Sequence, residues 1–571
     1  MRLRPIAALV VLLTLVSGMA SATPRADADH TEYYFTSSDG VTTLHADVLR
    51  PTGLAADVKT PVILTVSPYT NHAPSSLGDA NGTGASNRFF DFLDLSHALE
   101  RGYTYVIVDL PGDGGSGGCN DWGGLREQGA VRAAVEWAAD QPWSTGKVAL
   151  FGKSYDGWTG LMGVAQQPKG LAAVVSLEPV FSGYRYIYMN GVRRAGFWPY
   201  GQSFTTYDAQ LGRPNETEYN VNSAPQVWCY PVNIAGQNVD WSETGPYWTE
   251  RNLVPTAEGK TTPVFMTQGF LETNTKPDGA YEYWNTLAGP DNRAWFGQFD
   301  HCRAWETQAK CGTSGTSVGD TERLAVGHPG FIEDVMTFLD LHLKGIQPEV
   351  TEPKVEVQDT LGRWRYEESW PPADTEYLTT ELRPGTYSDD GSGAGRRPST
   401  TTGIWSVSQP LEHDAWMAGT PTVSVSVDAI PNVNFAANLY DIDPDGKVTM
   451  ISRGVQSLTG TGVRNFTVTL YGQDWPIAAG HRIAVRIGGA DTDEFQYGGT
   501  ATRQTVTVRN ARITLPFLTD NRTEFLEGAS TGKLEQYLAF ANVTMTPEQI
   551  AAAEADFGLP GPLVERPAGA V

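Results

Sequence analysis

The first part of the chain alternates continuous apolar segments with segments of helical period, and no other feature constrains the fold as strongly. Apolar runs typical of buried strands occur at 61–66, 103–110, 147–151, 172–177, 263–267 and 293–299. Helices are expected over 127–140, 157–166 and 331–344. Strands that alternate with helices indicate βαβ units around a mainly parallel sheet, so we expect an α/β domain over residues 31–350.

Two other regions lack this alternation. Residues 182–255 are crowded with Tyr, Trp, Asn and Pro, which favours an inserted cap rather than further sheet elements. Beyond residue 350, short Val-, Thr- and Ile-rich runs are separated by turn residues, and no helical period appears before Thr546. This pattern predicts an all-β sandwich or jelly roll (galactose-binding-like) over 351–545, followed by a tail at 546–571.

Length and composition exclude several classes of protein. The chain has 571 residues, enough for large cores, and its 21 Phe, 23 Tyr and 16 Trp need a packed interior. It carries 41 basic against 65 acidic side chains, a net charge of −24, which argues against a nucleic-acid partner. The sequence does not specify an oligomeric state.

The first residues predict export. Arg2 and Arg4 precede an apolar run at 6–16, and Ala20-Ser21-Ala22 follows as a small-residue cleavage site. We therefore expect a signal peptide over residues 1–22 and a secreted, extracellular protein that begins at Thr23. A membrane anchor is the rival interpretation, but the run is short for a bilayer span, and no later segment is apolar enough.

The chain has four cysteines, and an even count in an exported protein predicts two disulfides. Cys302 and Cys311 would close a short loop, which leaves Cys119 with Cys229; of the three pairings, we favour this one. No Cys-x-x-Cys spacing suggests zinc. The segment 441–446 imitates the start of a calcium loop, but Ser452 stands where the loop needs Glu, so a hairpin turn is expected. We therefore expect neither a metal nor a cofactor.

The segment 152–157 reads Gly-Lys-Ser-Tyr-Asp-Gly and lies between a predicted strand and a predicted helix. This G-x-S-x-x-G pattern in that context predicts a nucleophile elbow, a sharp turn that lifts the hydroxyl of Ser154 above the sheet edge. The helix N-terminus then faces the hydroxyl. The alternative is a purely structural role, in which the segment is a tight β-to-α turn with a capping serine.

The residues that an elbow serine needs occur later in the chain and in the expected order. In the α/β-hydrolase fold an acid and then a histidine follow the nucleophile on loops after later strands. Glu272 follows the strand that ends at Thr267, and His301 follows the strand that ends at Phe299. Of nine histidines, His301 alone has this position. Asp278 is the second candidate for the acid.

Seven segments together resemble the Xaa-Pro dipeptidyl-peptidase and cocaine-esterase-like (CocE/NonD) serine hydrolases. They are 67–70, Asp109 with 112–118, 152–157, 269–276, 338–345, 370–372 and 441–446. The resemblance covers nearly the whole chain after the predicted signal peptide. Where this family usually has a catalytic Asp, the sequence has Glu272, which can also orient a histidine because Ser-His-Glu triads exist on this fold.

The resemblance implies a role for each of these residues. Ser154 would be the nucleophile, His301 its general base and Glu272 the acid that fixes the tautomer of His301. The hydroxyl of Tyr69 and the backbone N–H of Tyr155 would form the oxyanion hole, each donor lowering the barrier by roughly 3–4 kcal/mol. Trp158, on the elbow helix, could line a proline-sized pocket or be a core residue.

The leading hypothesis is thus a secreted serine peptidase that releases N-terminal Xaa-Pro dipeptides through an acyl-enzyme on Ser154. A carboxylesterase or α-amino-acid-ester hydrolase with the same triad is the alternative, so the expected partner is a peptide or ester substrate. A different class is a carbohydrate-binding protein with an inactive α/β domain, but an intact set of Ser, acid and His argues against it.

Overall fold

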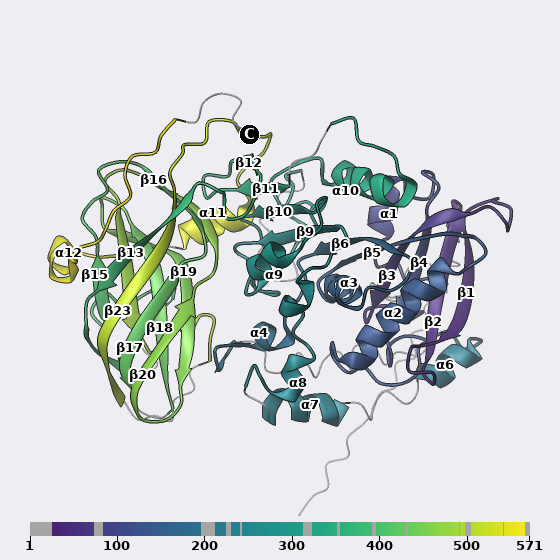
Figure 1. Cartoon of the computed structure of the whole chain (residues 1–571), viewed down its shortest axis with the longest axis horizontal. Coiled ribbons are helices and arrows are strands. Elements are labelled where there is room, and N and C mark those ends of the chain that lie inside the picture. Colours follow the sequence, from purple (N-terminus) through teal and green to yellow (C-terminus); the bar gives the residue numbers. More distant parts are fainter. Residues whose placement is uncertain are drawn as a thin grey trace, which may run out of the picture.

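The structure is a computed structural model that describes residues 25–73, 84–195, 212–223, 230–239, 242–311, 322–350, 354–390, 395–429, 432–489, 491–496, 504–540 and 542–565. The predicted signal peptide, residues 1–22, lies outside these ranges. The described chain has an α/β half, built around one large sheet, and an all-β half beside it (Figure 1). Within the described residues, no helix is long and apolar enough to cross a membrane.

The α/β half contains a ten-stranded sheet in the order β1-β2-β4-β3-β5-β6-β9-β10-β11-β12. The strands from β4 to β11 in this order are parallel, and β1, β2 and β12 are antiparallel to their neighbours. Each of the six apolar runs predicted as strands is a strand of this sheet. The bounds are β1 (Ala28–Thr36), β2 (Thr43–Pro51), β3 (Thr60–Ser67), β4 (Thr104–Asp109), β5 (Ser144–Lys153), β6 (Leu171–Leu177), β9 (Val264–Gly269), β10 (Arg293–Gly297), β11 (Val355–Gln358) and β12 (Trp364–Glu367).

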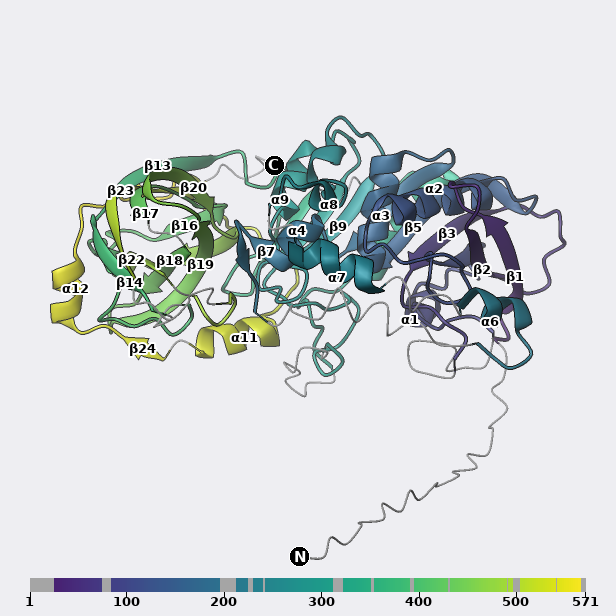
Figure 2. The same ribbon diagram turned by 90° about the horizontal axis from the view of Figure 1, so that it is seen from below.

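Both faces of the central strands β3, β4 and β9 are buried, which explains why these segments are long apolar runs, whereas the edge strand β1 is partly exposed. In β3, Val62 and Leu64 join one hydrophobic core with residues of α2 (Leu125–Ala139) and α3 (Tyr155–Gln166). Ile63 points to the other face and packs with residues of α1 (Phe90–Ser96) and α10 (Phe331–Leu339). Figure 2 shows α2 and α3 on one side of the sheet and α1 on the other.

The described part of the segment between β6 and β9 adds no strand to the main sheet, in agreement with the prediction that the alternation of strands and helices is interrupted there. It contains α4 (Gly183–Ile187), β7 (Tyr188–Met189), β8 (Val192–Arg193), α6 (Thr217–Ser223), α7 (Tyr230–Val239), α8 (Pro246–Thr249) and the 3-10 helix η2 (Val254–Ala257). After β9 come α9 (Ala280–Thr286), β10 and α10, which continues as one wider turn, η3 (Asp340–Lys344).

The C-terminal half is all-β, as predicted, apart from two short helices. One sheet has the order β20-β17-β23-β16-β21, with β13 and β14 also paired to β23, and the other has the order β15-β22-β18-β19-β24. Apolar residues of both sheets share one core. The bounds are β13 (Thr375–Leu382), β14 (Gly385–Asp389), β15 (Ile404–Val407), β16 (Ala415–Gly419), β17 (Thr422–Ala429), β18 (Val433–Ile442), β19 (Lys447–Leu458), β20 (Gly462–Thr469), β21 (Gln473–Ile477), β22 (Arg482–Gly488), β23 (Gln504–Leu518) and β24 (Val543–Thr544).

The structure differs from the sequence prediction in two places in this half. Strands β11 and β12 follow residue 350, the predicted end of the α/β domain, yet they are hydrogen-bonded to the main sheet through β10, so the sheet extends beyond that boundary. Helix α11 (Gly532–Ala539) lies where no helix was expected. Its N-cap residue Thr531 accepts a hydrogen bond from Leu534 N and donates one to Gln298 O, a long-range contact that local sequence does not report.

Two smaller predictions are confirmed. The segment 441–446 ends β18 and turns into β19, with Gly446 N donating to Asp443 O (2.9 Å), so it is a hairpin turn. The helical period expected from Thr546 onward corresponds to α12 (Pro547–Ala553), which begins with a capping box formed by Thr546 and Gln549.

Candidate active site

Ser154 lies at the sharp turn between β5 and α3, with φ 66° and ψ −122°. A non-glycine residue rarely adopts such a backbone conformation, and it persists here because the neighbouring chain fixes it. Ser154 N donates to Leu177 O (2.8 Å), and Trp158 N donates to Ser154 O (2.9 Å). These contacts identify the turn as a nucleophile elbow rather than an ordinary capped helix start.

The two glycines of the elbow motif are explained by close packing. A Cβ atom at Gly152 would lie 2.4 Å from Asp156 Cβ, and one at Gly157 would lie 2.9 Å from Leu177 O. Position 157 therefore requires glycine, because the first turn of α3 passes directly against the end of β6.

Glu272 and His301 form a buried hydrogen-bonded pair. His301 Nδ1 lies 2.8 Å from Glu272 Oε2, and Asn274 N donates to Glu272 Oε1 (2.5 Å). Although burial opposes it, the neighbouring His301 lowers the pKa of Glu272, so the group is an ionised carboxylate. With Nδ1 held by this carboxylate, Nε2 is the ring nitrogen left for proton transfer. Glu272 and His301 follow β9 and β10, at the same sheet edge as Ser154.

Asp278, the second candidate for the acid, has a different partner. Its Oδ2 forms an ion pair with Arg194 Nη2 (3.0 Å), and Oδ1 lies 3.9 Å from Arg185 Nη1. Because these guanidinium groups hold the carboxylate away from the histidine, Glu272 and not Asp278 is the residue paired with His301.

A second contact brings the elbow and the histidine loop together, although β5 and β10 are not neighbours in the sheet. Lys153 Nζ, adjacent to the serine, donates to His301 O (3.0 Å). The hydrogen bond from Ser154 Oγ to His301 is not formed between these described residues. Such contacts are often long before a substrate closes the site, so the structure contains the Glu272–His301 pair already formed, without the contact to the serine.

Tyr69 follows β3 at the same sheet edge, and its ring is held on two sides. The guanidinium carbon of Arg88 lies 4.2 Å from the ring centroid, and the ring of Tyr155 lies edge-on at 6.3 Å. Arg88 is in turn fixed by Asp156 (Nε to Oδ2, 2.8 Å), two residues after the serine. Tyr155 supplies the first amide of α3, and in this fold the amide after the nucleophile contributes to the oxyanion hole.

Trp158 is a core residue, the other of its two predicted roles. Its side chain has 0% exposed surface and packs against Trp122 and Tyr155, with ring centroids 5.4 and 5.3 Å away. Gly123 approaches the same indole so closely that a Cβ there would lie 2.1 Å from it. A side chain enclosed in this way cannot contact a substrate without rearrangement of the core, so the pocket assignment is not supported.

Glu178 belongs to the site and was missed in the sequence. It follows β6 directly, is fully buried, and its carboxyl accepts hydrogen bonds from Thr267 Oγ1 and Gly269 N, both at 3.2 Å. Burial, followed by the neighbouring Glu272, raises the pKa of Glu178 well above its usual range. Glu178 is therefore protonated beside an ionised Glu272. Its position after the apolar run 172–177 is the signal that could have indicated it.

The disulfide between Cys302 and Cys311 is present, as predicted, and begins directly after His301. Cys119 is also disulfide-bonded, whereas its predicted partner Cys229 lies outside the described residues. The Cys302–Cys311 bond closes the loop that follows His301, which restricts the conformations available to that loop.

Comparison with known proteins agrees with this geometry. Residues 39–303 match the family model of the X-Pro dipeptidyl-peptidase (S15 family), and residues 348–526 match that of the X-Pro dipeptidyl-peptidase C-terminal non-catalytic domain. A protein of Streptomyces avermitilis described as a Xaa-Pro dipeptidyl-peptidase is 27% identical over 403 residues, which cover 65% of this chain and 54% of that protein. The match thus spans about half the length of the Streptomyces relative.

Other relatives carry two kinds of name. A Bacillus anthracis protein, also described as a Xaa-Pro dipeptidyl-peptidase, is 24% identical and covers 82% of this chain and 83% of its own length. A Mycobacterium bovis protein described as a serine esterase is 22% identical over a match that covers 81% of this chain and 90% of that protein. Among solved structures, a CocE/NonD family hydrolase from Staphylococcus aureus superimposes with a TM-score of 0.63 at 14% identity, covering 86% of this chain and 97% of that one.

Proposed function

The chain belongs to the X-Pro dipeptidyl-peptidase (S15) family of serine hydrolases, and we propose that it releases N-terminal dipeptides, preferentially those with proline in second position. The observation that carries this proposal is the buried Glu272–His301 pair (2.8 Å) at the same sheet edge as the Ser154 elbow. An acid, a base and a strained serine at adjacent strand ends are the parts that acyl transfer requires.

In the proposed reaction, His301 Nε2 removes the proton from Ser154 Oγ as the oxygen attacks the scissile carbonyl. The tetrahedral oxyanion accepts hydrogen bonds from the Tyr69 hydroxyl and the Tyr155 N–H. The imidazolium then protonates the leaving amine, and an acyl-enzyme remains on Ser154. Water, activated by the same imidazole, hydrolyses that ester and restores the serine.

Glu272 stabilises the imidazolium and fixes the tautomer with the proton on Nδ1. Glu178, which keeps its own proton, acts on the site through Glu272 and is a positioning residue. A protonated carboxyl beside an ionised one removes the repulsion that two buried carboxylates would have.

A carboxylesterase with the same triad is the second candidate, because one relative is described as a serine esterase and one structural neighbour as a CocE/NonD family hydrolase. The two reactions share every catalytic group named above. They differ in whether the site must bind a free N-terminal ammonium and protonate an amine leaving group.

We further propose that the protein is exported and that the segment between β6 and β9 caps the site. The charged and apolar residues of the first 22 positions support export, and so does the Cys302–Cys311 disulfide. The short helices of that segment and its aromatic composition support a cap that closes over a short peptide terminus.

A panel of chromogenic substrates tests the proposal. Xaa-Pro and Xaa-Ala amides with a free N-terminus, the same compounds with an acylated N-terminus, and simple esters are compared by kcat/KM. We expect the free Xaa-Pro amides to be cleaved fastest and acylation to abolish their cleavage. Rapid hydrolysis of simple esters without any cleavage of free dipeptidyl amides would establish the esterase instead.

A further inference from the structure

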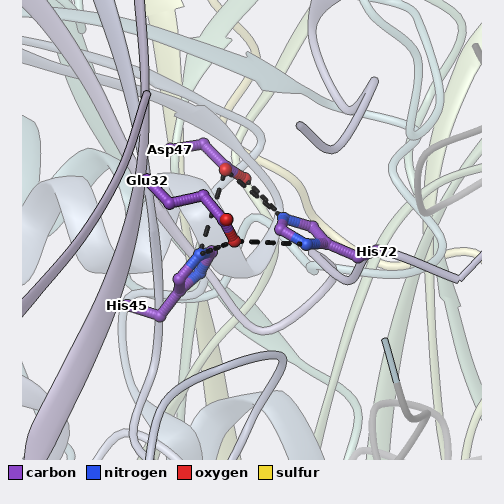
Figure 3. A group of neighbouring side chains, drawn as sticks. All are labelled: Glu32, His45, Asp47 and His72. Atoms are coloured by element: carbon purple, nitrogen blue, oxygen red, sulfur yellow. Dashed lines mark hydrogen bonds and ion pairs between the residues drawn. The ribbon is translucent and has the colours of Figure 1, made fainter. Parts of the chain in front are cut away.

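A compact group of histidine and carboxylate side chains lies outside the proposed active site. Glu32 comes from β1, His45 and Asp47 come from β2, and His72 comes from the loop after β3; we call these four residues the His–carboxylate cluster (Figure 3). His45, Asp47 and His72 are almost completely buried, and the side chain of Glu32 is 35% exposed. Nothing in the proposed reaction uses them.

The strand pairing places two of the carboxylates directly opposite each other. Glu32 and Asp47 are partners across the antiparallel β1–β2 pair, and His45 lies on the same face as Asp47 because it is two residues away. Like charges in directly opposite positions destabilise a sheet unless a positive charge lies between them. The cluster therefore requires a cation or protonated side chains.

The distances within the cluster fit coordination of a small cation. His45 Nε2 lies 3.3 Å from Glu32 Oε1, and His72 Nε2 lies 3.1 Å from Asp47 Oδ2. His45 Nε2 is also 3.9 Å from Asp47 Oδ1. One ligand atom from each of the four residues lies within 4.8 Å of the others. In a tetrahedral zinc site, ligands bound at about 2.0–2.2 Å are separated by roughly 3.3–3.6 Å.

Further carboxylates hold both imidazoles in the orientation that a metal ligand needs. His45 Nδ1 is 2.8 Å from Asp109 Oδ2, and His72 Nδ1 is 3.0 Å from Glu216 Oε1. Asp109 is itself fixed by Gly115 N (2.7 Å) and by the hydroxyl of Thr70. A histidine that donates one ring N–H to a carboxylate presents the lone pair of its other nitrogen, as metal-binding histidines do.

We propose that Glu32, His45, Asp47 and His72 bind one divalent metal ion, with Zn²⁺ preferred. Two imidazole nitrogens and two carboxylate oxygens can supply four zinc ligands, and a site closed by four protein ligands is the arrangement of a structural rather than a catalytic zinc ion. The ion would neutralise the paired carboxylates of β1 and β2 while both imidazoles remain neutral. Its four ligands come from protein, which leaves no position for a substrate.

Such an ion would connect three parts of the chain. His72 lies three residues after Tyr69 on the same loop, and Thr70 between them contacts Asp109, the partner of His45. The ring of Tyr219, from α6, stacks on His72 with centroids 4.4 Å apart. Metal binding would therefore stabilise β1, the Tyr69 loop and the segment between β6 and β9 together.

Protonation is the competing way to supply positive charge. Although burial opposes it, Asp109 and Asp47 raise the pKa of His45 to about 9, and Asp47 and Glu216 raise the pKa of His72 to about 10. Without a metal, protonation of imidazole would have to supply the positive charge beside these carboxylates. The test must therefore measure metal directly rather than stability alone.

The test uses the full chain as purified. After saturation with ZnCl₂ and removal of free metal, inductively coupled plasma mass spectrometry gives the zinc content, and Co²⁺ replaces zinc for visible spectroscopy. The variants His72→Gln and Asp47→Asn are compared with His328→Gln. His328 pairs with Glu356 (2.8 Å) but belongs to no group of three potential ligands in the described part of the chain.

We expect one Zn²⁺ per chain in the wild type and in His328→Gln, and loss of that ion in both cluster variants. Co²⁺ should give the intense visible bands of a tetrahedral site, and chelation should lower the Tm of the wild type by several degrees. Less than a tenth of an equivalent of zinc and a Tm that neither zinc nor chelator changes would overturn the proposal in favour of the protonated network. Zinc retained in both cluster variants would overturn it too. If a variant does not fold, the Co²⁺ spectrum of the wild type decides.

Discussion

Glu272 and Glu178 are two buried carboxyl groups in contact, and they differ in charge because Glu272 is the one hydrogen-bonded to His301. His301 lowers the pKa of Glu272 against the effect of burial, whereas burial and the charge of Glu272 raise the pKa of Glu178. The pair therefore carries one negative charge and one proton. A second ionised carboxylate at this depth would cost several kcal/mol.

Replacing Glu272 by Gln should lower kcat by about 10⁴-fold with little change in folding, because an amide cannot stabilise the imidazolium and can hold the wrong tautomer of His301. Glu272→Asp should be milder, since the charge is kept and only reach is lost. Asp278→Asn is the matched control and should leave kcat within a few-fold. Steady-state kinetics measure these effects, and thermal melts check that each variant is folded. A large loss of kcat in Asp278→Asn with nearly normal kcat in Glu272→Gln would refute the assignment of Glu272 as the acid.

Glu178 should give the protein a stability component that depends on pH. Its folded-state pKa is raised above the unfolded value of about 4.3, so its contribution is complete below that value and is lost as pH rises toward the folded pKa. Glu178→Gln removes the titrating group and keeps a donor for Glu272. The unfolding free energy of the wild type should therefore fall relative to Glu178→Gln by at most about 1.4 kcal/mol per pH unit above pH 4.3.

Urea denaturation of both proteins at several pH values between 4.5 and 8 measures this difference. Parallel stability curves over that range would show that Glu178 is not protonated in the native state.

Ser154, Glu272 and His301 could be proposed from the sequence because each follows an apolar strand in an order that the α/β-hydrolase fold prescribes. Glu178 has the same kind of position but was passed over, since its chemistry depends on contact with a residue 94 positions later. The His–carboxylate cluster was missed for a similar reason: its residues come from two strands and a loop and have no fixed spacing in the chain. Searches for Cys pairs and for calcium loops could not find it.

Two helical glycines differ in whether a larger side chain could replace them, and local packing rather than helix propensity decides the difference. Gly157 in α3 and Gly129 in α2 are both helical. A Cβ at Gly157 would lie 2.9 Å from a backbone oxygen, whereas at Gly129 the nearest atom would be Ser38 Cβ at 3.6 Å.

Gly129→Ala should accordingly stabilise the protein by about 0.5–1 kcal/mol, because alanine is the better helix former and ordinary contact distance is kept. Gly157→Ala should destabilise by about 1–3 kcal/mol and reduce kcat, because the clash with Leu177 O must displace the turn that carries Ser154. Chemical denaturation of the two variants checks the opposite signs. A stabilised, fully active Gly157→Ala would contradict the packing account.

Strands and helices of the main sheet were predictable because both faces are covered and the apolar runs are long. Helix α11 was not predictable from the sequence, and neither was the membership of β11 and β12 in the main sheet. Each is fixed by partners far away in sequence: Thr531 contacts Gln298 O, and β11 pairs with β10. The local residue pattern cannot predict contacts between residues so far apart in the sequence.

The two halves of the molecule meet close to the proposed active site, and the β half supports the histidine loop directly. Lys533 Nζ of α11 lies 2.6 Å from Asp300 Oδ2, one residue before His301. The other oxygen of Asp300 accepts from Thr273 N (3.0 Å), one residue after Glu272. Although burial opposes it, Lys533 lowers the pKa of Asp300. The carboxylate of Asp300 thus connects the loop that carries Glu272 and the loop that carries His301 to the C-terminal half.

Lys533→Met should therefore lower both stability, by about 1–3 kcal/mol, and kcat, by several-fold or more, because Asp300 stays buried without its cation. Lys533→Arg keeps the charge and should restore most of both. Melting temperature and kcat of the two variants are the measurements. Wild-type values in Lys533→Met would show that the C-terminal half does not support the site.

The central claim is that Ser154 is a nucleophile activated by His301, and labelling with a fluorophosphonate tests it most directly. Mass mapping of the labelled wild type should find one adduct, on Ser154, while Ser154→Ala should take no label and lose hydrolysis by several orders of magnitude. His301→Ala should fold but label far more slowly than the wild type. An adduct on another residue, or substrate turnover by Ser154→Ala near the wild-type rate, would contradict the account.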